Sequence, residues 1–266
     1  MLSRYAWTTA CLAALIFFAG GVGAQAGDSF EILSFNSPTG NIAREGKLYV
    51  PPMAQGRSPA VIFFHGTDGV DQRYDYHRTG LLNLGIAVFE LDFKTGIYKS
   101  GADRPKAEFF YPLAFAALGA LRANPKIDPN RIASMGWSAG ATISVGVALT
   151  GIQKQWLPNG EKPFAAYVGL YGGCNSQRGS NGLDGAPILV LQGTDDTLVP
   201  VERCVTFQKQ FRNVEFVAYK GVHHEFDKEG ANVVERNGDI LRWNQEAAED
   251  ARNRIRTFLV KSLKVG

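Results

Sequence analysis

The chain has 266 residues, of which 45% are hydrophobic, and this composition is enough to bury one sizeable core. Its formal net charge is +3, and no run of basic residues interleaves with aromatic residues along the sequence. We therefore expect no nucleic-acid partner.

The first 26 residues have the pattern of a secretory signal peptide. Arg4 supplies a positive charge, residues 10–19 are almost wholly apolar, and small residues precede Gly27. The apolar run is shorter than the roughly 20 residues that a membrane span needs. We expect residues 1–26 to be a signal peptide that directs the protein to the periplasm or the cell exterior, with no stable membrane insertion after cleavage. An uncleaved anchor is the alternative.

Removal of this segment also removes Cys11 and leaves Cys174 and Cys204. An even number of cysteines in an oxidising compartment allows a disulfide, which here would close a loop of about 30 residues. Two buried free thiols are the alternative. Histidine and cysteine never cluster at ligand spacing, so we expect no metal site.

Strand-like and helix-like segments alternate over residues 27–266, which predicts a single α/β domain with a mostly parallel sheet flanked by helices. The predicted strands are 47–50, 60–64, 86–91, 131–137, 165–170, 187–192 and 214–219. The predicted helices are 76–84, 106–123, 140–149 and 243–263. The stretch 151–163 is expected to be a loop close to the functional site.

A serine stands at one of the predicted strand-to-helix junctions, in the sequence Gly136-Trp137-Ser138-Ala139-Gly140. A nucleophilic serine at such a junction occupies a strained turn, and it needs small residues two positions away on each side. The turn lifts the Ser138 hydroxyl from the sheet edge toward the first amides of the next helix. An inert serine at a tight turn is the alternative interpretation.

A serine hydroxyl is a weak nucleophile that needs a base, and the base needs an orienting carboxylate. His223 and His224 follow one predicted strand, and Asp195 and Asp196 follow another. The chain order serine, aspartate, histidine is the order found in α/β-hydrolases, and all these residues come just after strands, where open α/β sheets place their sites. The residues alone leave open which aspartate and which histidine take part.

The chain resembles the dienelactone hydrolase family of the α/β-hydrolases over nearly all of its length after the signal segment. Members of that family carry their acid in a G-x-x-D-x-x-V-P loop, matched here by Gly193, Asp196, Val199 and Pro200. They carry their base in a G-x-x-H-G-F-like segment, matched by Gly221, His224 and Phe226. The resemblance implies an α/β-hydrolase fold with a catalytic triad of Ser138, Asp196 and His224.

Acyl transfer also needs donors for the oxyanion that develops on the substrate. The backbone N–H of Ala139, the residue after the nucleophile, supplies one donor, and the resemblance implies the Thr67 N–H as the second. His65 is interpreted as a residue that braces this loop. The chain departs from the best-known members of the family, which use a cysteine nucleophile and a glutamate where Gly66 stands.

The resemblance also bears on the cysteines, because some exported relatives carry a pair at the positions of Cys174 and Cys204. It thereby implies that these two residues form a disulfide.

These patterns together predict a serine hydrolase that cleaves small-molecule carboxylic esters or related acyl compounds through an acyl-enzyme. We expect no metal or organic cofactor. A peptidase or a polyester depolymerase on the same triad is an alternative, because one triad serves all these substrates. A non-catalytic binding protein on a hydrolase scaffold is an alternative of another class. Nothing in the sequence indicates the oligomeric state.

Overall fold

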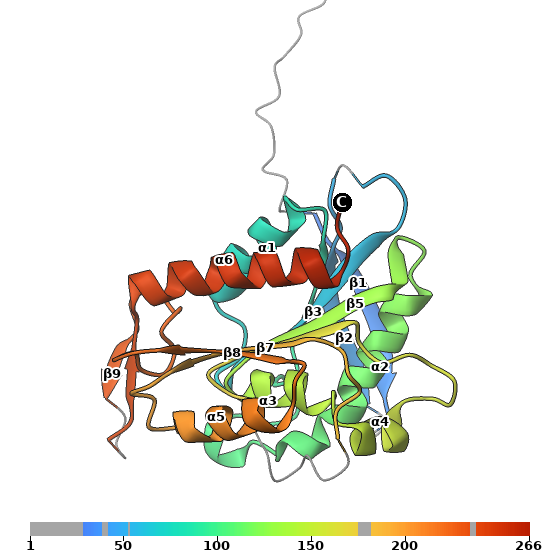
Figure 1. Ribbon diagram of the computed structural model, residues 1–266. Coiled ribbons are helices and arrows are strands. Elements are labelled where there is room, and N and C mark those ends of the chain that lie inside the picture. The colour runs from blue at the N-terminus through green and yellow to red at the C-terminus, as the bar shows by residue number, and fades with distance from the viewer. Residues whose placement is uncertain (1–28, 39–41, 53, 175–181, 235–237) are drawn as a thin grey trace, which may run out of the picture.

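The computed structural model describes residues 29–38, 42–52, 54–174, 182–234 and 238–266 (Figure 1). The expected signal peptide over residues 1–26 lies outside this part of the chain.

Eight strands form one sheet in the order β1-β2-β4-β3-β5-β6-β7-β8. Strand β2 pairs antiparallel with both of its neighbours, and every pair from β4 to β8 is parallel. This mostly parallel sheet with flanking helices confirms the predicted α/β-hydrolase fold. The strands span Glu31–Ser37 (β1), Ile42–Tyr49 (β2), Ser58–Phe64 (β3), Ala87–Leu91 (β4), Ile127–Trp137 (β5), Ala166–Leu170 (β6), Ile188–Gly193 (β7) and Val214–Tyr219 (β8).

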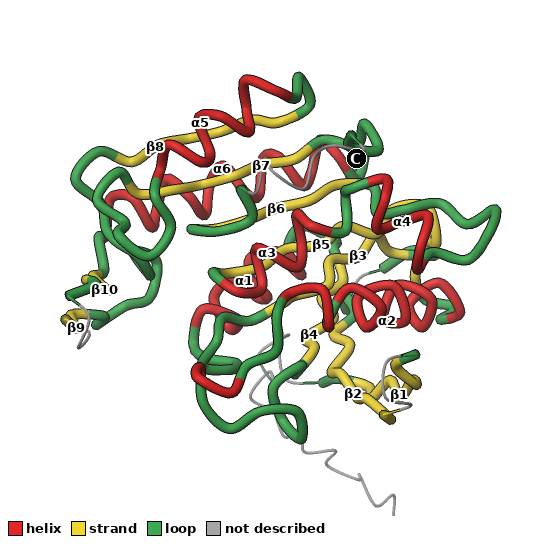
Figure 2. The backbone as a smooth tube through the Cα atoms, turned by 90° about the horizontal axis from the view of Figure 1, so that it is seen from below, coloured by secondary structure: helices red, strands yellow, loops and turns green. Residues whose placement is uncertain are grey.

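Helices cover both faces of the sheet: α1 and α6 lie on one face, and α2, α3, α4 and α5 lie on the other (Figures 1 and 2). The helices span Arg73–Leu82 (α1), Tyr111–Ala123 (α2), Ala139–Gly146 (α3), Thr150–Trp156 (α4), Val201–Gln210 (α5) and Gln245–Ser262 (α6). Two short 3₁₀ turns, Gly101–Asp103 (η1) and Ala107–Phe109 (η2), precede α2. None of the helices in the described ranges is long and apolar enough to cross a membrane.

The core consists of two apolar layers, one on each face of the sheet, and strand β3 contributes to both. Side chains alternate between the faces of a strand. Val61 and Phe63 therefore pack on the α1 and α6 side, whereas Ile62 and Phe64 pack on the α2 and α3 side. All four are at most 1% exposed. Burial of each such side chain contributes about 1.5–3 kcal/mol, which explains why β3 is continuously apolar in the sequence.

The stretch 151–163 was expected to be a loop, and this prediction is wrong for its first half, which belongs to α4. Ile152 and Trp156 are one helical turn apart, and both pack against the core. The Gln153 amide donates hydrogen bonds to the Val147 carbonyl at 3.0 Å and to the Asp184 carboxylate at 2.7 Å. These contacts stabilise a helix too short to be evident from its sequence pattern.

Strand β1, helix α5 and the two strands of a short hairpin, Asn232–Val234 (β9) and Ile240–Arg242 (β10), were not predicted either. Only one residue of β1 is buried, and all three residues of β9 are exposed, so neither shows the apolar run of a buried strand. Helix α5 buries only Cys204 and Phe207. Segments with so little buried surface carry a weak hydrophobic pattern.

A disulfide joins Cys174 to Cys204. Cys174 lies just after β6, and Cys204 lies in α5, so the bond fastens the loop after one central strand to the helix after the next. Both residues are buried, at 5% and 1% exposure.

Replacement of both cysteines by serine should lower the free energy of unfolding by about 3.5 kcal/mol, because the unfolded chain loses a closed loop of about 30 residues. Urea unfolding followed by tryptophan fluorescence measures this difference. An unchanged midpoint in the double variant would show that the bond does not constrain the protein in solution.

Candidate active site

Ser138 lies at the turn between β5 and α3 in a backbone conformation that non-glycine residues rarely adopt. Its φ and ψ angles are 51° and −112°. The Ser138 N–H donates to the Leu170 carbonyl of β6 at 2.9 Å, and the Ser138 carbonyl accepts from the Thr142 N–H at 3.1 Å as the helix begins. Such strain persists only where the surrounding structure holds it. The turn leaves Ser138 half-buried at the carboxyl edge of the sheet.

The two glycines of the pentapeptide are required by space. An ideal Cβ on Gly136 would lie 2.2 Å from the backbone of Gly140, and one on Gly140 would lie 1.9 Å from the Phe64 carbonyl oxygen of β3. Both distances are far below van der Waals contact. The turn from β5 into α3 can therefore pack against β3 only if both residues lack a side chain.

His224 lies on the loop after β8, and its Nε2 is 3.0 Å from the Ser138 Oγ. The residue is 4% exposed. The Arg242 N–H of β10 donates to the His224 carbonyl at 3.0 Å, so the small hairpin supports this loop.

Asp196 lies on the loop after β7, and its Oδ2 is 2.7 Å from the His224 Nδ1. The carboxylate is 3% exposed and also accepts hydrogen bonds from the Val199 N–H at 2.9 Å and from the Gln192 Nε2 at 2.7 Å. Three donors thus fix its position. Because Nδ1 donates to this carboxylate, Nε2 is left as the acceptor that faces Ser138.

Gln192 was missed by the sequence reasoning. It is fully buried at the end of β7, and its amide also donates to the Val199 carbonyl at 2.9 Å. The available signal was a polar residue at the end of an otherwise apolar buried strand. Such a residue must find hydrogen-bond partners at the sheet edge.

The neighbouring residues Asp195 and His223 have different contacts. His223 Nδ1 is 3.0 Å from the Asp195 carbonyl oxygen, and the Thr194 hydroxyl donates to the Asp195 carboxylate at 2.8 Å. The structure therefore brings Asp196 and His224, and not their neighbours, to Ser138.

The backbone amides of Thr67 and Ala139 are the expected oxyanion donors. Ala139 is the first residue of α3, where the N–H has no partner within the helix. Within the described part of the chain, neither amide donates a hydrogen bond to another residue. The Thr67 carbonyl accepts from the Tyr98 hydroxyl at 3.1 Å, and the Gly69 N–H donates to the Gly66 carbonyl at 3.3 Å, so the loop that carries Thr67 is held in place.

His65 packs within this loop. Its ring stacks on Phe93 with the centroids 3.8 Å apart, and it is 1% exposed. The Phe93 N–H donates to its Nε2 at 3.1 Å, and its Nδ1 lies 2.6 Å from the Gly66 carbonyl oxygen. Both ring nitrogens of His65 thus contact backbone atoms, one in its own loop and one in the loop after β4.

Gly66 lies beside the serine. An ideal Cβ at this position would be 3.9 Å from the Ser138 Cβ, so a longer side chain here would reach the serine hydroxyl. No group of three or more histidine, cysteine or acidic side chains capable of holding a metal ion occurs among the residues that the structure describes.

Residues 45–263 match the model of the dienelactone hydrolase family. An uncharacterized protein of Mycobacterium tuberculosis is 26% identical over 203 residues, and the match covers 68% of each protein. Two solved structures share the fold. A dienelactone hydrolase-like promiscuous phosphotriesterase from metagenomic libraries has a TM-score of 0.70 at 18% identity, covering 88% of this chain and 98% of that one. Esterase 2 of Thermogutta terrifontis has a TM-score of 0.66 at 18% identity, covering 90% of this chain and 95% of that one.

A methyl group at residue 140 tests the packing of the turn. Gly140→Ala should destabilise the protein by about 3 kcal/mol or more, because the added Cβ overlaps the Phe64 carbonyl. Gly119→Ala is the matched control. Gly119 lies on the exposed face of α2 with no atom within 4 Å of its ideal Cβ, so this change should stabilise the protein by about 0.5–1 kcal/mol. Denaturant unfolding compares the two, and equal midpoints would contradict the close packing.

Proposed function

Because the chain belongs to the dienelactone hydrolase family, we propose that it is a serine hydrolase that cleaves carboxylic esters or related acyl compounds. The observation that carries this proposal is the continuous line of contacts from Asp196 through His224 to Ser138, at 2.7 Å and 3.0 Å. These are hydrogen-bond distances between an acid, a base and a nucleophile in the order that acyl transfer needs.

The first half of the reaction forms an acyl-enzyme. His224 Nε2 takes the Ser138 proton while Ser138 Oγ attacks the carbonyl carbon of the substrate. The Asp196 carboxylate accepts a hydrogen bond from the Nδ1–H. This bond fixes the tautomer of the imidazole and stabilises the imidazolium. The N–H groups of Thr67 and Ala139 bind the oxyanion, and the start of α3 adds the favourable field of its dipole. His224 then donates its proton to the leaving alcohol as the tetrahedral intermediate collapses.

The second half repeats these steps with water. His224 takes a proton from a water molecule, the resulting hydroxide attacks the acyl carbon, and the proton returns to Ser138 Oγ as the acid product leaves. Export of the protein belongs to the same proposal. The signal-like segment over residues 1–26 and the Cys174–Cys204 disulfide support it, because disulfides persist in oxidising compartments.

Substitution of the triad residues should abolish turnover without unfolding the protein. Ser138→Ala and His224→Ala should each lower kcat on the order of 10⁴ to 10⁶-fold, and Asp196→Asn should cost less but still heavily. Initial rates with p-nitrophenyl acetate measure these losses, and circular dichroism checks the fold.

His223→Ala and Asp195→Asn are the matched controls, because each alters the same residue type one position away. Both should retain rates close to that of the wild type. Loss of activity in His223→Ala, with His224→Ala active, would contradict the assignment of the base.

The choice of substrate class is tested on the wild-type protein. We expect p-nitrophenyl acetate to be hydrolysed much faster than aminoacyl anilides, because the dienelactone hydrolase family supports activity on esters. A preference for anilides would favour a peptidase. Absence of turnover with every ester of a chain-length series would favour a binding protein.

A further inference from the structure

A group of buried polar side chains lies behind the triad, and we call it the Asp227 cluster. Its members come from four segments that are far apart in the sequence, and each member is at most 5% exposed. The cluster consists of Arg73 and His77 of α1, Trp137 at the end of β5, Tyr171 just after β6, and Asp227 on the loop that carries His224.

Asp227 is the centre of this cluster. Its Oδ2 accepts a hydrogen bond from the Trp137 Nε1 at 2.9 Å, and its Oδ1 accepts one from the Tyr171 hydroxyl at 2.7 Å. The Tyr171 oxygen in turn accepts from the Arg73 Nη1 at 2.6 Å, and the His77 Nε2 lies 3.8 Å from the carboxylate. Trp137, Tyr171 and Arg73 thus all have hydrogen-bond partners inside the cluster, and such a buried network is rigid.

Asp227 remains ionised in these surroundings. Burial by itself would raise the pKa of Asp227, but contacts with His77, Arg73 and Tyr171 hold that pKa below its usual value. A carboxylate enclosed in this way fixes the positions of the donors around it. If a donor moved away, a charged or polar group would be left without a partner in the protein interior, which costs free energy.

The two hydrogen bonds that Asp227 accepts, from Trp137 and Tyr171, come from residues next to the proposed triad. Trp137 immediately precedes Ser138. Tyr171 follows Leu170, whose carbonyl accepts the Ser138 N–H, and the Tyr171 ring packs against the His224 ring in a T-shaped contact with centroids 4.7 Å apart. Asp227 itself lies three residues after His224.

The backbone around these contacts is strained. Among the residues that the structure describes, only four non-glycine residues have a positive φ, and three of them are Ser138, Tyr171 and Glu225, with values of 51°, 41° and 55°. Glu225 directly follows His224, and its carboxylate contacts the Arg73 Nη2 at 3.3 Å. Residues held in such conformations need surrounding contacts that keep them there.

We propose that Asp227 is a positioning residue, which holds Ser138 and His224 in register through its bonds to Trp137 and Tyr171. This inference rests on the proposed serine hydrolase function and assigns Asp227 no contact with substrate. A displacement of about 1 Å at the reacting atoms costs on the order of 10²-fold in rate, so loss of these bonds lowers kcat more than it alters KM.

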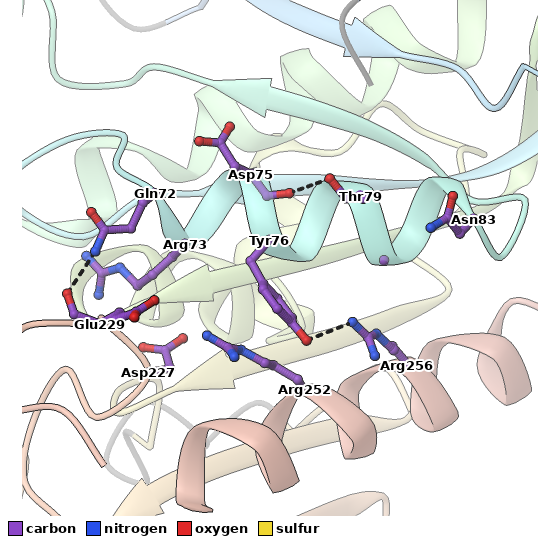
Figure 3. A pocket seen from close by; sticks show the side chains of 11 residues that line it. Gln72, Arg73, Asp75, Tyr76, Thr79, Asn83, Asp227, Glu229, Arg252 and Arg256 are labelled. Carbon is purple, nitrogen blue, oxygen red and sulfur yellow. Dashed lines mark hydrogen bonds between the residues drawn. The ribbon is translucent and has the colours of Figure 1, made fainter. Parts of the chain in front are cut away.

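Asp227 and Arg73 also line a cavity of about 470 Å³ between α1 and α6 (Figure 3). Arg252 stacks on the Tyr76 ring at 3.6 Å in its wall, and Arg256 bonds the Tyr76 hydroxyl at 3.2 Å. Figure 3 shows that the Arg252 side chain extends toward Asp227. The lining carries the guanidinium groups of Arg73, Arg252 and Arg256 together with the carboxylates of Asp75 and Glu229, and a small anion from solvent can reach the place of the Asp227 carboxylate through this cavity.

The first experiment compares two tyrosines of the same strand segment. Tyr171→Phe removes the hydroxyl that bonds Asp227 and keeps the ring against His224. Tyr167→Phe is the matched control, because the Tyr167 hydroxyl also bonds a carboxylate, Asp184, but at the other end of β6. We expect Tyr171→Phe to lower kcat at least about tenfold with KM little changed, and Tyr167→Phe to keep the wild-type kcat.

The second experiment restores the carboxylate from solution. Asp227→Ala should lower kcat on the order of 10²-fold, and it leaves a hole of the size of a carboxylate beside the cavity. Sodium formate should then restore part of the lost kcat, whereas sodium chloride at the same ionic strength should not. Ser138→Ala in formate should stay inactive. Asp227→Asn keeps the volume of the side chain and serves if the alanine variant does not fold.

Wild-type kcat in both Tyr171→Phe and Asp227→Asn, while Ser138→Ala is inactive, would overturn the positioning role and leave the hydrolase function standing. Wild-type turnover in Ser138→Ala would instead overturn the hydrolase mechanism itself. In crystals of Asp227→Ala or Asp227→Asn, the 3.0 Å contact between Ser138 Oγ and His224 Nε2 should lengthen beyond hydrogen-bond distance. Its persistence in both variants would overturn the proposal irrespective of turnover.

Discussion

The turn from β5 into α3 passes so close to the end of β3 that the Phe64 carbonyl oxygen occupies the space that a side chain on residue 140 would need. This close packing fixes the strained backbone of Ser138, turns its hydroxyl out of the sheet edge, and aims the Ala139 N–H at the same point. The loops after β7 and β8 begin at this same edge, because parallel strands run in one direction and their carboxyl ends lie together. The contacts among Ser138, Asp196 and His224 follow from that shared edge.

The sequence was informative where a segment is buried on both faces or carries a functional motif. The apolar run that became β3 and the chain order serine, aspartate, histidine indicated the fold and the kind of site. The choice of Asp196 and His224 over Asp195 and His223 came from the family resemblance and not from the residues alone. Helices α4 and α5 bury little, so their pattern was weak. Nothing in the sequence around His77 reveals that it faces a carboxylate 150 residues away. Buried polar contacts between distant segments become visible only when the chain is folded.

Two carboxylates near His224 have different contacts. Asp196 bonds the imidazole directly, whereas Asp227 bonds the residues around it. Gly66 stands where the best-known members of the family have a glutamate that partners a cysteine nucleophile. Gly66 has no side chain to contact the Ser138 hydroxyl, whose hydrogen-bond partner is the His224 Nε2 at 3.0 Å. The serine is thereby suited to a proton transfer through histidine, the arrangement that general ester hydrolysis uses.

The most direct measurement is the reaction of the purified protein with a fluorophosphonate, followed by peptide mapping by mass spectrometry. Such reagents react with a serine only where a neighbouring base activates it. We expect one adduct, on Ser138, and a rate of adduct formation that falls by orders of magnitude when His224 is replaced by alanine. An unmodified Ser138, or an adduct that forms equally fast without His224, would contradict the proposed mechanism.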